Sequence, residues 1–120
     1  MIARILGTLR AAGVRYTILV VGHGAAELRK ACPGTQSVLQ VEQLGTGHAV
    51  LMAETRFKGV VLVLPGDAPL VRPETLRILV ARVRAGAACA FLTADYPNPG
   101  SLGRVVRDAA GEVLAIVEKA

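Results

Sequence analysis

The sequence predicts an α/β fold with a mainly parallel sheet. Three short apolar runs, Tyr16–Val21, Gly59–Leu64 and Ala87–Thr93, have the length and continuity of strands that are buried on both faces. Stretches with apolar residues at helical spacing alternate with these runs, and glycine or proline closes most of them. A strand followed by a crossover helix and a second strand is the repeating unit of parallel sheets, so this alternation favours one sheet covered by helices.

Length and composition fit a single domain over residues 1–120. Of the 120 residues, 52% are apolar, and no linker, low-complexity stretch or repeat divides them. A domain of this size buries roughly two thirds of the surface that its unfolded chain exposes. A hydrophobic core can therefore form without disulfides or a structural metal.

The first part of the chain predicts two helices and two strands. An amphipathic helix opens the chain, and Gly13 can supply its left-handed cap. The strand Tyr16–Val21 follows, and then a helix over Ala25–Ala31 that Pro33 stops. A short strand is expected over Ser37–Val41. The buried stripe of the opening helix is formed by Ile2, Ile5, Leu6 and Leu9.

The middle of the chain predicts two further helices and two further strands. A helix is expected from about His48 to Arg56, followed by the strand Gly59–Leu64. Pro73 suits the first position of the next helix, and the apolar strand Ala87–Thr93 comes after it. The buried stripe of that helix comprises Leu76, Leu79, Val80 and Val83.

The last part of the chain predicts a β-hairpin. Two prolines and two glycines between Asp95 and Gly103 indicate a loop. The strands Arg104–Arg107 and Glu112–Glu118 then flank a turn at Asp108–Gly111.

The charge pattern argues against nucleic-acid binding. The chain carries 14 basic and 9 acidic side chains, a net charge of +5, but the basic residues are dispersed and aromatic residues make up only 3%. Nucleic-acid surfaces cluster their cations or interleave them with aromatic rings, so a solvated basic face is favoured.

Apolar runs and cysteines indicate a cytoplasmic protein outside the membrane. No run approaches the ~18 residues of a membrane helix, and Met1–Arg4 does not begin a signal peptide. Cys32 and Cys89 are far apart in apolar surroundings and lack a CxxC partner. Buried free thiols are therefore favoured over a disulfide or a metal site.

A first candidate ligand turn follows the strand that ends at Val21. Gly22-His23-Gly24 leads into a helix and resembles half of a dinucleotide fingerprint, but Glu27 stands where that fingerprint has a small residue. An acidic side chain there would face the pyrophosphate. A plain turn that needs glycine for its backbone angles is the favoured interpretation.

A second candidate turn is richer in binding groups. The stretch Gln40–Ala49 contains Gly45-Thr46-Gly47 at a helix entrance, where backbone amides are free to approach a base or a phosphate. Gln40 and Gln43 could pair with a base edge. This stretch is either a binding loop or an ordinary strand-to-helix connection.

A third candidate is Asp67, which directly follows the strand Gly59–Leu64 and a Pro65-Gly66 pair. Magnesium commonly takes one or two protein carboxylates together with substrate phosphates, so a single aspartate can nominate its site. The alternative is an aspartate that caps a turn.

Motifs for other chemistries are missing from the sequence. It contains no HExxH, no GxSxG and no GxxxxGK[ST] loop. Transfer between groups that are already anionic needs no protein base, because positioning and neutralisation of charge by a metal are sufficient.

Three motifs together resemble a known family. The stretches Val38–Ala49, Gly66–Leu70 and Gly103–Asp108, followed by Ile116-Val117-Glu118, are similar in order and spacing to the uridyltransferase domain of the bifunctional N-acetylglucosamine-1-phosphate uridyltransferase/glucosamine-1-phosphate acetyltransferase family. The resemblance spans nearly the whole chain. It implies a Rossmann-like nucleotidyltransferase fold with helices on both faces of the sheet.

The resemblance also implies a reaction and a set of residues. The sugar 1-phosphate attacks the α-phosphorus of UTP and gives UDP-N-acetylglucosamine, a precursor for peptidoglycan, together with pyrophosphate. Asp67 would bind Mg²⁺, and Gly103 and Glu118 would hold the sugar. Without the resemblance, Gly103 is a glycine at the start of a strand and Glu118 an exposed strand residue. The nucleotide would be contacted by Gln40, Gly45 and Thr46.

The sequence departs from the family in ways that bear on activity. Nothing before Met1 supplies the family's first strand and its glycine-rich phosphate loop, and Ser101-Leu102 replaces part of its Gly-Tyr-Gly-Arg segment. In a 3-2-1-4 strand order, the first strand lies between Tyr16–Val21 and the strand that ends at Leu64. We therefore expect a partial domain that does not turn over alone. The alternatives are a nucleotidyltransferase of another nucleotide or acceptor, and a non-catalytic nucleotide-binding module that assembles into a homo-oligomer through unpaired strands.

Overall fold

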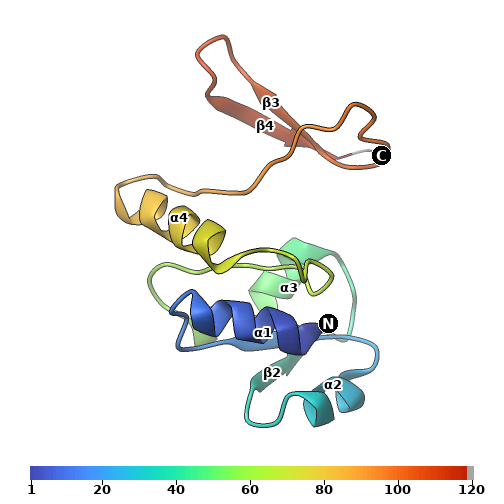
Figure 1. The fold of residues 1–120 in the computed structure, drawn as a ribbon. Helices are drawn as coiled ribbons and strands as arrows, with labels where there is room; N and C mark the ends of the chain where they lie inside the picture. Colours follow the sequence, from blue (N-terminus) through green and yellow to red (C-terminus); the bar gives the residue numbers. More distant parts are fainter. Residues whose placement is uncertain (119–120) are drawn as a thin grey trace. The chain divides into compact units, whose positions relative to one another are not determined.

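The computed structural model describes residues 1–118 and contains two compact units, Met1–Ala90 and Phe91–Ala120. Figure 1 shows helices and the parallel strand pair in the first unit and a hairpin in the second. The assignment of residues 1–120 to a single domain stays a prediction.

The first unit contains α1 (Ile2–Ala11), β1 (Ile18–Val21), α2 (Ala25–Ala31), β2 (Gln36–Leu39), α3 (Thr46–Ala53), the 3-10 turn η1 (Glu54–Arg56) and α4 (Pro73–Arg84). All of the predicted helices are confirmed. The helix expected from about His48 begins two residues earlier and ends in the 3-10 turn.

The core of the first unit forms where α1 packs with α4. The predicted stripe of α1 contributes Ile5, Leu6 and Leu9, and α4 contributes Leu76, which is 1% exposed. Burying one such side chain contributes roughly 1.5–3 kcal/mol. Both helices end as expected at glycines with left-handed backbone angles, because Gly13 has φ +91° and Gly86 has φ +113°.

The predicted parallel pairing is found between β1 and β2. Ile18 lies opposite Gln36 and Val21 opposite Leu39, and α2 forms the crossover between the two strands. Arg29 of α2 donates a hydrogen bond from its Nε to the Ser37 hydroxyl of β2 at 2.9 Å. The chain therefore contains one β-α-β unit of an α/β fold.

Within residues 1–118, the strands predicted over Gly59–Leu64 and Ala87–Thr93 are not formed, and those predictions were wrong. The first segment has no backbone hydrogen bond from residue 60 to 64 in this described range. Leu62 and Leu64 pack against the core, whereas Val63 is 51% exposed. An apolar run becomes a strand only beside a partner that satisfies its backbone, and no described strand adjoins this one.

The two cysteines differ in their surroundings. Both are free, and Cys32 is buried in the core as predicted, but Cys89 is exposed. The prediction of a buried Cys89 was wrong because the strand expected around it does not form.

The second unit is the predicted hairpin of β3 (Arg104–Arg107) and β4 (Val113–Val117). The strands are antiparallel, with a register shift between Val106 and Arg107. The Asp108 carboxylate accepts hydrogen bonds from the backbone N–H groups of Ala110 and Glu112, both at 2.9 Å, and thereby fixes the predicted turn.

None of the helices within residues 1–118 has the length and apolar character needed to cross a membrane.

Candidate functional site

The loop between β2 and α3 is held together by Gln40. The Gln40 backbone N–H donates to the Val21 carbonyl at 2.8 Å, which extends the β1–β2 pairing by one hydrogen bond. Its side-chain Nε2 donates to the Gly45 carbonyl at 3.2 Å and to His48 Nδ1 at 2.9 Å. Both hydrogens of the amide are thus used, one in the loop and one at α3, and the Oε1 atom is the part that remains for a ligand.

Gly45 and Thr46 form the entrance to α3. Gly45 has φ +96°, a backbone conformation that favours glycine, and its carbonyl also accepts the first helical hydrogen bond, from Ala49 at 3.1 Å. Thr46 is the first residue of the helix and is exposed. The first N–H groups of a helix have no partner within it, so the backbone here presents free donors.

The Gln40 side-chain contacts form a first tether of this loop. A second tether, which was not predicted from the sequence, joins the loop to the turn after β1. Gln43 donates from Nε2 to His23 Nδ1 at 2.8 Å. Gly22 makes room for it, because a Cβ atom at Gly22 would lie 2.4 Å from the same Nε2 atom. The only signal in the sequence was the pair of glycines around His23, and paired glycines occur in turns of many kinds.

The loop lines a large cavity inside the first unit. The cavity measures about 1560 Å³, and its lining includes residues of β1 on one side and the unpaired residues 60–64 on the other. Gln40, Gln43, Gly45 and Thr46 line it on one side, and Pro65 and Gly66 line it after the unpaired segment. The cavity therefore brings the predicted nucleotide residues to the same space as the turn that precedes Asp67.

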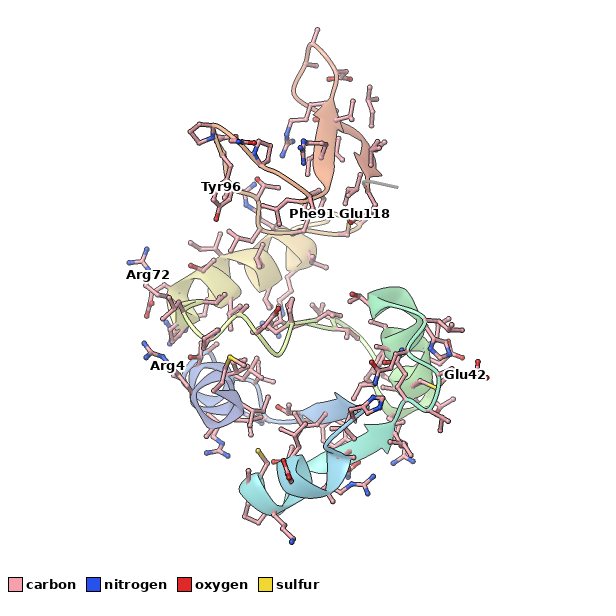
Figure 2. The ribbon with its side chains drawn as sticks, turned by 90° about the vertical axis from the view of Figure 1, so that its right-hand side faces the viewer. Arg4, Glu42, Arg72, Phe91, Tyr96 and Glu118 are labelled. Atoms are coloured by element: carbon pink, nitrogen blue, oxygen red, sulfur yellow. The ribbon has the colours of Figure 1, made fainter. Side chains whose placement is uncertain are left out.

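Glu42 is the acidic residue of the loop. Its side chain points outward in Figure 2, and Glu42 is not among the residues that line the cavity. Among residues 1–118, no aspartate or glutamate lines the cavity. A polyanionic ligand would therefore meet no carboxylate repulsion from these lining side chains.

Asp67 lies in a turn in which the Ala68 backbone N–H donates to the Pro65 carbonyl at 3.4 Å. The side chain is exposed, and its carboxylate takes part in no side-chain hydrogen bond or ion pair in the described part of the chain. The alternative interpretation as a capping aspartate therefore has no described hydrogen bond to support it. A free carboxylate with two hard oxygen ligands fits the chemistry of Mg²⁺.

No group of three or more histidine, cysteine, aspartate or glutamate side chains that could enclose a metal occurs within residues 1–118. A magnesium ion at Asp67 would therefore take most of its ligands from water and substrate phosphates, as this ion commonly does.

Gly103 and Glu118 are brought together in the second unit. Arg104 pairs with Val117, so the residues just before and just after this pair face each other at the open end of the hairpin. A Cβ atom at Gly103 would lie 2.9 Å from a carboxylate oxygen of Glu118, which Figure 2 labels. The absent side chain of Gly103 thus leaves room for the Glu118 carboxylate. The candidate sugar residues are neighbours in one unit, and the candidate nucleotide and metal residues belong to the other.

Comparison with known proteins gives one consistent result. The pattern of the MobA-like NTP transferase domain matches residues 1–118. The Bifunctional protein GlmU of Cellvibrio japonicus is 46% identical over 122 residues, which cover 98% of this chain and 27% of that protein. The proteins of the same name from Alkaliphilus oremlandii and Geobacter metallireducens are 45% and 46% identical and each covers 99% of the chain. The chain spans about a quarter of the length of these curated relatives.

Proposed function

This chain belongs to the MobA-like NTP transferase domain family, and from that premise we propose that it forms the nucleotide-binding part of a sugar-1-phosphate uridyltransferase. The proposed substrates are UTP and N-acetylglucosamine 1-phosphate, and the products are UDP-N-acetylglucosamine and pyrophosphate. The observation that carries the proposal is the loop from Gln40 to Thr46, whose side-chain tethers leave its acceptor and donor atoms free at the cavity.

Gln40 and the start of α3 have the groups that a uracil ring requires. Uracil presents an imide N–H between two carbonyl oxygens. The free Oε1 atom of Gln40 can accept from the imide, and the Thr46 hydroxyl or the first N–H groups of α3 can donate to a carbonyl. The left-handed Gly45 lets the backbone approach a flat ring without a side chain in the way.

In the proposed reaction, a phosphate oxygen of the sugar 1-phosphate attacks the α-phosphorus of UTP. The bond between that phosphorus and the oxygen bridging to the β-phosphate breaks, and pyrophosphate leaves. The attacking group is already anionic at neutral pH, so the protein needs to orient the two substrates and needs no base. Mg²⁺ held at Asp67 would neutralise phosphate charge.

Gly103 and Glu118 are the proposed sugar contacts. The Glu118 carboxylate can accept hydrogen bonds from sugar hydroxyl groups, and Gly103 keeps the space beside it open. This part of the proposal rests on the close approach of these two residues and on the resemblance of their motifs.

The finer fold assignment is also a proposal. We propose a Rossmann-like sheet with helices on both faces in which the place of the first strand, between β1 and residues 60–64, is the cavity. Two observations on residues 1–118 support it: the edge of β1 that faces away from β2 has no strand partner there, and residues 60–64 make no backbone hydrogen bond there. Because the phosphate-binding loop would follow that strand, we propose that residues 1–120 alone do not turn over.

Titration with UTP, with and without Mg²⁺, tests the proposed nucleotide specificity. UTP should bind more tightly than ATP, CTP or GTP, and Thr46→Val should remove the preference, a change of about tenfold. Thr55→Val is the matched control, because Thr55 is exposed in η1 and outside the cavity lining. Preference for another base would overturn the uridine assignment in favour of a related nucleotidyltransferase.

The same titration, combined with sedimentation velocity, distinguishes the proposed transferase from a non-catalytic module that assembles into oligomers. A non-catalytic module that oligomerises through the open edge of β1 is the second candidate, and it is favoured by the backbone that has no strand partner there within residues 1–118. Failure to bind any nucleotide, together with a defined oligomer in sedimentation velocity, would support that candidate and contradict the transferase assignment.

We also propose that the protein is cytoplasmic and contributes to the synthesis of peptidoglycan precursors. We propose that it has no nucleic-acid or membrane partner. The free thiols of Cys32 and Cys89 are compatible with a reducing compartment.

A further inference from the structure

The turn after β1 and the loop after β2 are joined by one side-chain contact that the proposed mechanism does not use. Gln43 is a loop residue three positions after Gln40, and His23 lies between Gly22 and Gly24 in the turn. The contact is the 2.8 Å hydrogen bond from Gln43 Nε2 to His23 Nδ1. It joins residues that are 20 positions apart, so it fixes the loop to a neighbouring element and not merely to itself.

The two tethers of the loop have different anchors. Gln40 binds Gly45 and His48, which belong to the loop and to α3, so this tether shapes the loop internally. Gln43 is bound outside the loop, at the end of β1. The Gln40 backbone N–H fixes the start of the loop to β1 through the Val21 carbonyl, and the Gln43 side chain adds a contact three residues further along that holds the rest of the loop relative to the sheet.

The missing side chain at Gly22 is part of this contact. Gly22 has no left-handed backbone angle, so its conformation does not require glycine. What a side chain there would meet is Gln43: a Cβ atom at position 22 would approach its Nε2 atom to 2.4 Å, its Cδ to 3.1 Å and its Cγ to 3.5 Å, so the Gln43 side chain would have to move away. The glycine therefore admits the Gln43 amide to the position from which it reaches His23.

We propose that His23, Gln43 and Gly22 form a latch that positions the nucleotide-binding loop at the carboxyl ends of β1 and β2. His23 and Gln43 are positioning residues: they act on a nucleotide through Gln40, Gly45 and Thr46. This inference rests on the proposed nucleotide-binding role of that loop, and it assigns to the Gly22-His23-Gly24 turn a role other than cofactor binding.

Two measurements on the full 120-residue chain test the latch. Amide hydrogen exchange of the loop without any nucleotide reports its order, and UTP titration reports the consequence for binding. His23→Leu and Gly22→Ala should each speed exchange at the Leu44 and Ala49 amides, which donate to the Glu42 and Gly45 carbonyls, by about threefold to tenfold, the equivalent of one net hydrogen bond. UTP affinity should fall by a similar factor, about threefold to tenfold.

Conservative variants distinguish the latch from general damage. In His23→Asn, the side-chain oxygen takes the place of Nδ1 and can accept from Gln43, so exchange and UTP affinity should return to within about twofold of the original. Gly7→Ala is the control for Gly22→Ala, because a Cβ atom at Gly7 would meet nothing within 4 Å. It should leave the loop unchanged.

A double-mutant cycle gives the sharpest result. If His23 and Gln43 act through each other, Gln43→Ala should have little further effect on loop exchange in a chain that already carries His23→Leu. Additive effects would overturn the latch, as would loop exchange in His23→Leu equal to that of the original chain, or a loosened loop with unchanged UTP affinity. If the original chain binds no UTP, the proposed function fails, and the exchange measurements alone then decide whether the latch exists.

Discussion

Two segments of the first unit have a similar sequence pattern, a strand-like run followed by a glycine-containing turn. They differ in how many hydrogen bonds their backbone and side chains form. β2 with its following loop, residues 36–46, is a strand that ends in a glycine-containing connection, and residues 60–67 are an apolar run that ends in Pro65-Gly66-Asp67. The first segment pairs with β1, and side-chain hydrogen bonds of Gln40 and Gln43 hold its loop. The second has, within the described chain, one long backbone hydrogen bond in its turn.

The contrast shows that apolar content does not decide which segment becomes a strand. Residues 60–64 are all apolar and stay unpaired within the described chain, whereas β2 contains Gln36 and Ser37 and is paired along its length. Backbone pairing needs a neighbour, and among residues 1–118 β1 supplies one to β2 alone. The ordered segment carries the proposed base contacts, and the unpaired one ends in the proposed metal ligand.

The largest effect is expected at the end of the unpaired segment. Because the Asp67 carboxylate takes part in no side-chain hydrogen bond or ion pair within residues 1–118, Asp67→Asn should leave the melting temperature unchanged. It should remove the magnesium-dependent gain in UTP binding and, in an active protein that contains this region, lower pyrophosphate release by about a hundredfold or more. Asp95→Asn changes another exposed carboxylate, outside the first unit, and is the control. Magnesium dependence that persists in Asp67→Asn would contradict the metal assignment.

A smaller effect tests the backbone difference itself. Amides that donate in the β1–β2 pairing should exchange with deuterium about tenfold or more slowly relative to those of residues 60–64, which have no acceptor within residues 1–118. Mass spectrometry of peptides from the two segments measures this. Equal protection would mean that residues 60–64 are paired in solution, and the comparison would no longer hold.

The third effect concerns the shape of the ordered loop. Gly45→Ala places a side chain at φ +96° and should cost about 1–3 kcal/mol of folding free energy, with a matching loss of loop order. Gly47→Ala is its matched control, because Gly47 is helical and a Cβ atom there would also meet nothing within 4 Å. Alanine at Gly47 should stabilise α3 by up to about 1 kcal/mol. Similar melting temperatures for the two variants would remove the backbone argument for Gly45.

The sequence predicted the elements whose signals are local. α1 and α4 were identifiable because their apolar stripes follow the helical period and glycine ends them, and the hairpin was identifiable from its turn residues. The run from Gly59 to Leu64 failed because a strand depends on a neighbour that the run itself does not encode.

In the candidate site, too, local features could be predicted from the sequence and contacts between distant residues could not. Gly45 could be predicted to have an unusual backbone angle, since a glycine at a helix entrance is a local signal. The contact between Gln43 and His23 could not be predicted, because it depends on the parallel register of β1 and β2 and on the space above Gly22. A single sequence contains no indication of which side chain fills that space.

Gly22 has one further consequence, which concerns how related sequences should vary. Its missing side chain makes room for the amide of Gln43, whereas its own backbone conformation does not need glycine. Positions 22 and 43 should therefore change together: a relative with alanine or serine at position 22 should carry a shorter residue at position 43. In such relatives, the residue at position 23 should no longer be restricted to side chains that accept a hydrogen bond.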